Sequence, residues 1–205
     1  MSVKRDMDDV QKLHLVGLTN SCRPNSYNHM VLNHIKSNFQ DLIDLHLFDI
    51  SKIPFYEDRA ETASFSHAIT ALSELISQSH GLIVASPEYN HSVPARLKNT
   101  IDWMSRMPAK PLLRLPVMLI SASTGLLGGV RVQYELRRIF EATDSRVMIK
   151  PEVFIGKVHE KFSTAGVCTD HETSALIKNQ FESFSDWMKN YSLNLNCFEE
   201  NVAHP

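Results

Sequence analysis

Residues 82–103 read LIVASPEYNHSVPARLKNTIDW and join an apolar run to a helical pattern through a proline-flanked loop. The run over 82–85 is apolar at every position, which is typical of a central parallel strand covered on both faces. After the loop, Leu97, Ile101 and Met104 recur at helical spacing. This stretch therefore predicts a buried strand, a stiff loop and a helix that packs back onto the sheet.

The same alternation continues through the rest of the chain. Further apolar runs lie at 13–18, 43–48, 117–120 and roughly 147–155. The apolar residues at helical spacing between or after these runs are Val31, Ile35 and Phe39; Phe65, Ile69, Leu72 and Ile76; Val132, Leu136 and Ile139; and Ile177, Phe181, Phe184, Met188 and Tyr191. Strands that alternate with helices predict an α/β fold, with a parallel sheet and helices on both of its faces.

The ends of the chain carry weaker patterns. Residues 169–172 form a T-x-x-E capping box, in which the Thr169 hydroxyl and the Glu172 carboxylate satisfy free amides at the start of the last helix. Nothing divides the chain, so we expect a single domain over 1–205. We expect a flexible N-terminus over 1–11 and an irregular tail over 192–205.

Composition excludes several classes of protein. The 205 residues carry a formal net charge of −2, which excludes the basic surface of a duplex nucleic-acid binder. Cys22, Cys168 and Cys197 are too few and too scattered for a disulfide framework or a zinc ribbon. The N-terminus is charged where a signal peptide needs an apolar stretch, and no apolar run approaches the ~18 residues that span a bilayer. We expect a cytoplasmic protein with no nucleic-acid or membrane partner.

In such a sheet, ligands bind beyond the carboxyl ends of the strands, where the strand order reverses. The loop after the first strand, TNSCRPNS over 19–26, opens into a helix N-terminus, which favours an anion. Arg23 can direct two donors at phosphate oxygens, and Ser21, Ser26 and Asn28 can supply more. Neither G-x-G-x-x-G nor a P-loop is present, so the loop predicts a site for one phosphate group. An ordinary Ser/Asn turn with a helix cap is the alternative.

The loop after the fourth strand, SASTGLLGG over 121–129, is rich in glycine. Glycine lets the backbone approach a ligand closely and adopt positive φ. We expect this loop to direct amides and a helix N-terminus at a ligand above the sheet, where fixed dipoles would stabilise negative charge.

The loop after the third strand carries a specific resemblance. Residues 86–103 resemble the signature of the NADPH-dependent FMN reductase family, P-E-Y-N-x-S-x-P-x-x-L-K-N-x-I-D-W. The first loop is similar to the phosphate motif of that family, G-S-x-R-x-x-S-x-N, with Asn20 in place of the usual glycine. The glycine-rich loop is similar to the third segment of the family.

This resemblance implies a flavodoxin-like three-layer sandwich with a five-stranded parallel sheet in the order 2-1-3-4-5. It implies bound FMN, with NADPH or NADH as the electron donor. The implied activity is ping-pong hydride transfer to flavins, quinones or similar small-molecule acceptors. The family also implies a homodimer or a homotetramer.

The resemblance also implies the residues that bind FMN. Those of the first loop would hold the phosphate, and those of the second would lie along the isoalloxazine, mostly through backbone groups. The expected cofactor-binding residues are Ser21, Arg23, Ser26, Tyr27, Asn28, Pro87, Glu88, Tyr89, Asn90, His91, Ser123, Thr124 and Gly125.

No catalytic side chain is expected, because hydride chemistry belongs to the cofactor. His91 is the nearest candidate for a proton donor, with a solvent-facing loop histidine as the alternative reading. Cys22 lies in an electropositive loop, which would depress its pKa, although a redox role is not favoured. The histidines form no H-E-x-x-H motif, so no metal site is expected. The alternative function is a flavodoxin-type electron carrier or an FMN-binding sensor without NAD(P)H chemistry.

Overall fold

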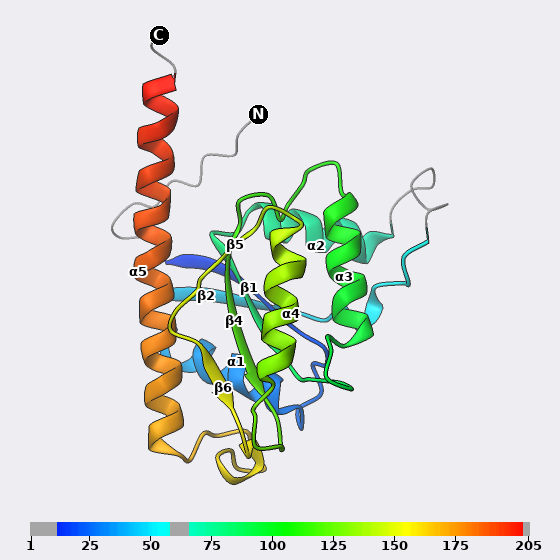
Figure 1. Cartoon of the computed structure of the whole chain (residues 1–205), viewed down its shortest axis with the longest axis vertical. Helices are drawn as coiled ribbons and strands as arrows, with labels where there is room; N and C mark the ends of the chain where they lie inside the picture. The colour runs from blue at the N-terminus through cyan, green and yellow to red at the C-terminus, as the bar shows by residue number, and fades with distance from the viewer. Residues whose placement is uncertain (1–11, 58–65, 203–205) are drawn as a thin grey trace.

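The computed structural model describes the backbone of residues 12–57 and 66–202, with side chains as far as Tyr191. The elements form three layers around a central parallel sheet (Figure 1). One face of the sheet is covered by α1 (Tyr27–Asn38) and α5 (His171–Val202). The other face is covered by α2 (His67–Ser77), α3 (Ala95–Arg106) and α4 (Val130–Glu141). The predicted flavodoxin-like α/β sandwich is confirmed.

The sheet has the order β2-β1-β3-β4-β5, and its neighbouring strands all run parallel. These strands are β1 (Leu13–Thr19), β2 (Ile43–Phe48), β3 (Gly81–Ser86), β4 (Pro116–Ala122) and β5 (Arg146–Val147). Every residue of β3 and β4 is buried, as their apolar runs predict for central strands. The predicted strand order is confirmed.

The fifth strand differs from the single run predicted over 147–155. The chain pairs with the start of β4 as β5, leaves the sheet, and returns as β6 (Val153–Ile155), which pairs with the end of β4. Pro151 lies in the gap, and a proline has no N–H to donate to a strand ladder. The prediction joined the two pieces because apolar residues such as Met148 and Ile149 continue the pattern up to the gap.

Two apolar clusters, one on each face of the sheet, hold the layers together. On one face, Val31 and Ile35 of α1 and Phe181 and Phe184 of α5 are fully buried in the same cluster. Each such side chain contributes about 1.5–3 kcal/mol relative to leaving it exposed. The helical periods predicted from the sequence therefore identify the faces that pack on the sheet.

The N-cap of α5 lies one residue beyond the predicted cap. The side chain of Asp170 accepts a hydrogen bond of 2.9 Å from the backbone N–H of Thr173. Thr169, the predicted cap, instead donates its hydroxyl to the carbonyl of Lys161 at 3.2 Å. The hydrogen bond with Thr173 lowers the pKa of Asp170. Asp170 is therefore the N-cap, and the predicted capping box does not form.

The irregular tail predicted over 192–205 is also corrected in part, because α5 continues to Val202 and extends past the sheet (Figure 1). The sequence has no glycine or proline between His171 and Val202, so nothing in it breaks the backbone pattern before Pro205. The segment predicted to be flexible (1–11) and Phe65, expected on the second helix, lie outside the described residues. Within the described part of the chain, none of the helices has both the length and the apolar character needed to cross a membrane.

Candidate functional site

Three loops meet at the carboxyl edge of the sheet. The strand register places Thr19 opposite Ala85, and Ser86 opposite Ser121, so β1, β3 and β4 end at one level. We call residues 20–26 loop 1, residues 87–94 loop 2 and residues 123–129 loop 3; together they form the rim. The rim is the position that the sequence predicts for the ligand.

Loop 1 turns tightly before α1. The Ser21 hydroxyl accepts hydrogen bonds from the backbone N–H and from Nε of Arg23, at 3.3 and 3.2 Å. The N–H of Ser26 donates to the carbonyl of Arg23 at 2.9 Å. Ser26 is the N-cap of α1 but makes no side-chain capping bond, and the first turn holds no acidic residue. The positive end of α1 is therefore uncompensated beside the exposed Arg23 side chain, which suits an anion.

Asn28 has a different place from the one expected for a phosphate ligand. Its side chain is buried, with Nδ2 donating to the carbonyl of Ala122 at 3.0 Å and Oδ1 accepting from the N–H of Ala122 at 3.0 Å. The amide group thus joins the first turn of α1 to the end of β4. Tyr27 is half-buried and packs against the core on that side. Asn28 therefore positions loop 1 relative to loop 3, and its two backbone contacts account for its burial.

Loop 2 contains a two-residue turn at its tip. The N–H of Tyr89 donates to the carbonyl of Ser92 at 3.0 Å, and the N–H of Ser92 donates back at 2.9 Å. Asn90 and His91 have φ values of 50° and 65°, which are those of a type I′ turn. The expected stiffness of loop 2 therefore comes from this turn as well as from Pro87 and Pro94. The side chains of Tyr89, Asn90 and His91 are exposed at the rim.

Glu88 binds the start of α4. One carboxylate oxygen accepts hydrogen bonds from the backbone N–H groups of Arg131 and Val132, at 3.0 and 3.2 Å. The other oxygen lies 3.3 Å from a guanidinium nitrogen of Arg131. The expectation that α4 directs its amides at the ligand is wrong for these two N–H groups, because Glu88 already occupies them. The Glu88 side chain is 11% exposed, so only its backbone remains to line the rim.

A second carboxylate holds loop 2, and the sequence analysis missed it. Glu135 of α4 accepts a hydrogen bond of 2.6 Å from the Ser92 hydroxyl and one of 3.2 Å from the N–H of Val93. Loop 2 is therefore attached to α4 at both of its ends. A glutamate on an amphipathic helix gives no sign in the sequence of such a distant partner.

Loop 3 lies against the segment that follows β6. Ser123 donates its N–H to the carbonyl of Ile155 at 2.9 Å, and its hydroxyl accepts from the N–H of Gly125 at 3.1 Å. Gly156, which the sequence analysis did not single out, is required by this contact: a Cβ there would lie 2.2 Å from the carbonyl oxygen of Leu126. Thr124 and Gly125 remain exposed at the rim.

Cys22 has surroundings opposite to those expected. Its thiol donates a hydrogen bond of 3.6 Å to the carbonyl of Phe48. Burial, together with the negative charge of Asp49, raises the pKa of the Cys22 thiol. The predicted depressed pKa is therefore wrong, and the thiol has no electrostatic activation.

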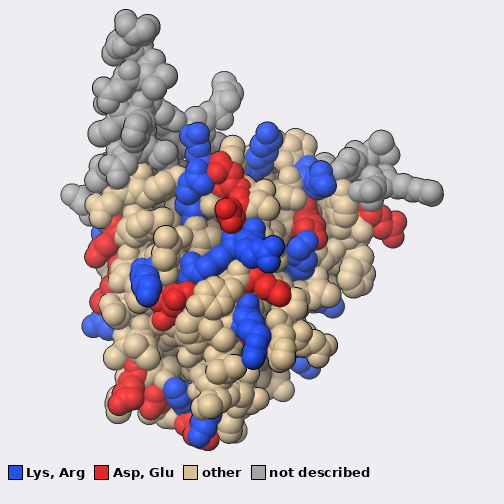
Figure 2. All heavy atoms as spheres, viewed as in Figure 1, with Lys and Arg blue, Asp and Glu red and all other residues tan. Residues whose placement is uncertain are grey.

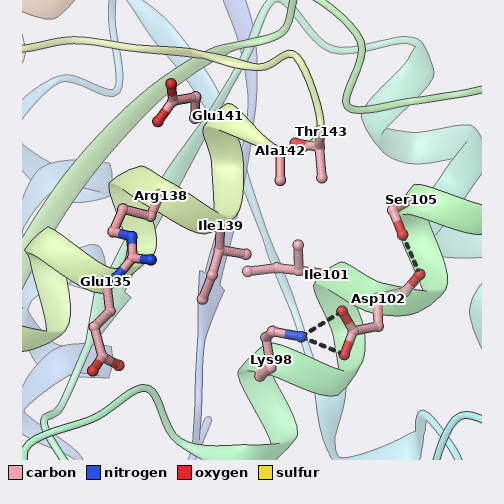
Figure 3. A pocket seen from close by; sticks show the side chains of 10 residues that line it. All are labelled: Lys98, Ile101, Asp102, Ser105, Glu135, Arg138, Ile139, Glu141, Ala142 and Thr143. Atoms are coloured by element: carbon pink, nitrogen blue, oxygen red, sulfur yellow. Dashed lines mark hydrogen bonds and ion pairs between the residues drawn. The ribbon is translucent and has the colours of Figure 1, made fainter.

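A groove of about 720 Å³ lies between α3 and α4, and Glu135, which binds loop 2, is among the residues that line it (Figure 3). Ile101 and Ile139 point toward each other across it, and Lys98 binds both carboxylate oxygens of Asp102, at 2.7 and 2.8 Å. Figure 2 shows that basic and acidic side chains are intermixed over this face of the molecule. Mixed charge around a small apolar contact does not resemble a flavin site.

The residues at the rim fit FMN. The guanidinium group of Arg23 makes one hydrogen bond with the described residues, from Nε to the Ser21 hydroxyl. Its other two nitrogens have no partner among the described residues. The buried Thr19 hydroxyl, at the end of β1, also lacks a hydrogen-bond partner among the described residues. An exposed tyrosine ring on loop 2 offers a flat apolar surface beside these polar groups. In the described part of the chain, no three His, Cys, Asp or Glu side chains are grouped to hold a metal ion.

Comparisons with known proteins agree with this geometry. Residues 13–160 match the family described as NADPH-dependent FMN reductase. A quinone reductase of Escherichia coli (strain K12) is 36% identical over 182 residues, covering 87% of this chain and 97% of that protein. An NAD(P)H-dependent FMN reductase of Pseudomonas aeruginosa is 34% identical over 182 residues, covering 89% and 97%.

Among solved structures, the flavoenzyme NAD(P)H:(acceptor) oxidoreductase FerB from Paracoccus denitrificans superposes with a TM-score of 0.80. It is 25% identical, and the match covers 87% of this chain and 98% of FerB. The family match and both relatives cover most of the chain. The chain therefore belongs to the NADPH-dependent FMN reductase family.

Proposed function

We propose that this protein is an FMN-dependent NAD(P)H oxidoreductase that reduces small-molecule acceptors such as flavins and quinones. The proposal is carried by one observation. The three loops whose sequences resemble the family's motifs meet at one rim, and loop 1 leads into an α1 N-terminus that has no side-chain cap and suits a phosphate group. The family match and the relatives named as quinone and FMN reductases support the activity. NADPH or NADH is the proposed electron donor.

Bound FMN would supply the hydride chemistry that connects the nicotinamide donor with the acceptor. The protein binds and orients it. Ser21, Arg23 and Ser26, with the first amides of α1, would hold the phosphate. The backbone of 87–91 and that of 123–125 would line the ring, and Tyr27, the first residue of α1, is also proposed to contact the cofactor.

Three side chains would set the geometry of the rim without contacting the cofactor. Asn28 joins loop 1 to loop 3, and Glu88 and Glu135 join loop 2 to α4. This rigid frame suits a cofactor whose ring must accept two different reactants in turn. We assign no proton-donating side chain.

Rapid mixing tests the hydride step. FMN-loaded protein mixed anaerobically with excess NADPH should lose its flavin absorbance in a single turnover, and adding a quinone should restore it. An absorbance band that NADPH and NADH both leave unchanged would contradict the proposal. That result would favour the alternative, a flavodoxin-type electron carrier or sensor, which the net charge of −2 and the named relatives do not favour.

We also propose that the enzyme is a homodimer or a homotetramer and that the groove between α3 and α4 takes part in the contact. The apolar pair Ile101 and Ile139, surrounded by charges of both signs, suits a second copy of the same face. Sedimentation velocity should give a mass of two or four chains, and Arg138→Glu should lower it, while Arg106→Ala should not. A monomeric wild-type protein at micromolar concentration would contradict this.

A cytoplasmic location is proposed as well. Cys22 and Cys168 are both free thiols, as is usual where glutathione and thioredoxin keep cysteines reduced. Cell fractionation with an antibody against the protein should recover it with cytoplasmic markers. Recovery with membranes would contradict the proposal.

A further inference from the structure

One side chain joins loop 1 to loop 2 across the rim. Nδ2 of Asn20 donates a hydrogen bond of 3.3 Å to the hydroxyl oxygen of Tyr89. Asn20 follows β1 directly, and Tyr89 lies three residues beyond the end of β3, so the bond spans two neighbouring strand ends. The glycine that usually stands at position 20 in the family has no side chain and cannot make this bond.

Because Asn20 donates this hydrogen bond, the hydroxyl hydrogen of Tyr89 remains able to donate to another group. A side-chain NH₂ group only donates, so the phenol oxygen is the acceptor here. The described residues provide no acceptor for the O–H of Tyr89, and the residue is 51% exposed. The phenol therefore presents a donor to solvent, or to a molecule that enters at the rim.

The Tyr89 ring is held at two points. Its backbone is fixed by the paired hydrogen bonds with Ser92, and its hydroxyl is fixed by Asn20. A tyrosine so held offers a flat face and one oriented donor, with little side-chain freedom left to lose on binding. A flat molecule with a carbonyl oxygen at its edge matches both features.

We propose that Asn20 is a positioning residue that orients the Tyr89 phenol so that its O–H donates a hydrogen bond to a carbonyl oxygen of the electron acceptor. The inference rests on the proposed function and deepens it, because it favours quinone-type acceptors over acceptors without a carbonyl group. A carbonyl oxygen gains negative charge as the acceptor is reduced, and a fixed donor stabilises that charge. No covalent step or proton transfer is assigned to either residue.

The first test compares two acceptors. Benzoquinone has carbonyl groups, and ferricyanide has none. In Asn20→Gly, which restores the family residue, the ratio of kcat/KM for benzoquinone to that for ferricyanide should fall about three- to tenfold, the value of one neutral hydrogen bond. The loss should appear in kcat as well as in KM for benzoquinone, because the hydrogen bond strengthens as the carbonyl oxygen gains charge. Asn25→Ala, at an exposed loop 1 asparagine, should leave the ratio unchanged.

The second test asks whether Asn20 acts through Tyr89. Tyr89→Phe removes the donor and should lower the ratio by a similar factor. The double variant Asn20→Gly/Tyr89→Phe should then be no worse than Tyr89→Phe, because the two residues act through one hydrogen bond to the acceptor. Asn20→Asp should also lower the ratio, because its carboxylate would accept the phenol hydrogen. Additive losses in the double variant would overturn the proposal.

A binding measurement gives a readout independent of turnover. Calorimetric titration of oxidised, FMN-loaded protein with 4-hydroxybenzaldehyde, a carbonyl compound used as a dead-end ligand, should show weaker binding in Asn20→Gly and Tyr89→Phe by about three- to tenfold. Equal affinity in wild type and Asn20→Gly would overturn the proposal, as would a loss of FMN affinity large enough to explain the kinetics. Failure of the proposed function would be distinct, because wild-type flavin would then not be reduced by NADPH.

Discussion

The carboxylate of Glu88, just after β3, accepts a hydrogen bond of 3.0 Å from the backbone N–H of Arg131 in the first turn of α4. The same oxygen also accepts from the N–H of Val132. A residue in the middle of a conspicuous cofactor signature is thus the cap of a helix that starts 42 positions later. Glu88 therefore stabilises the rim by joining loop 2 to the first turn of α4.

Replacing Glu88 should therefore cost stability. Glu88→Ala leaves two amide groups of α4 without a partner, and we expect a loss of about 1–3 kcal/mol in the free energy of unfolding, or roughly 2–12 °C in Tm. Thermal denaturation followed by circular dichroism measures this. Glu141→Ala, at the exposed end of α4, is the control and should change Tm little. A Glu88→Ala protein as stable as the wild type would show that the cap is not formed.

Replacing Arg23 should weaken FMN binding with little effect on the fold, because the side chain is exposed and contacts only Ser21 among the described residues. We expect Arg23→Ala to raise the Kd for FMN about ten- to hundredfold, the value of a hydrogen bond to a charged group. Riboflavin, which lacks the phosphate, should bind equally to both proteins. Fluorescence titration measures both affinities, and equal weakening for the two flavins would argue against a phosphate contact.

Asn28 should behave in the opposite way. Asn28→Ala removes two hydrogen bonds from the buried backbone of Ala122, so we expect the free energy of unfolding to fall by about 2–4 kcal/mol. Since its amide positions loop 1 and does not select the phosphate, affinities for FMN and riboflavin should fall by the same factor. Urea denaturation and the two titrations test this, with Asn25→Ala as the control. A loss confined to FMN would restore a direct phosphate role for Asn28.

The cap of α5 should make stability depend on pH in the acid range. Hydrogen bonds with Thr173 lower the pKa of Asp170 below its ordinary value of 3.8. A carboxyl group whose pKa is lower in the folded state stabilises the fold above the unfolded pKa, and this contribution is lost as pH falls through the folded pKa.

The difference in stability between the wild type and Asp170→Ala should therefore be constant from pH 7 to about 5, and should disappear below the lowered pKa. Urea midpoints measured across this range provide the test. Thr169→Ala serves as the comparison, because its hydroxyl bonds to Lys161 and should give a pH-independent effect. A pH-independent difference for Asp170→Ala would contradict the assignment of the cap.

The sequence predicted the layers well because burial leaves a direct trace in the residues. The runs over 82–85 and 117–120 are apolar throughout, and both lie in strands buried on two faces. Prediction failed where two neighbouring residues compete for one role. Thr169 and Asp170 both suit an N-cap, and only the backbone path decides which of them binds the amide of Thr173.

The sequence predicted three loops that the structure brings to one edge of the sheet, but it did not predict the contacts of their polar residues. Arg23 and Ser21 act within one loop, so their proximity could be inferred from the chain itself. Asn28 contacts a residue 94 positions away, and Glu88 contacts residues 43 and 44 positions away. Such partners depend on how strands and helices are assembled, and a single sequence does not contain that information.

The contact between Gly156 and Leu126 limits how this enzyme can be re-engineered. Mutant libraries aimed at new acceptors can vary Thr124 and Leu126, whose side chains are exposed. Position 156 has to be kept as glycine, because a Cβ there would clash with the backbone of Leu126 and displace loop 3. Libraries that randomise loop 3 and position 156 together would therefore contain mostly misfolded variants. Altered selectivity is better sought at the exposed residues of loop 3 alone.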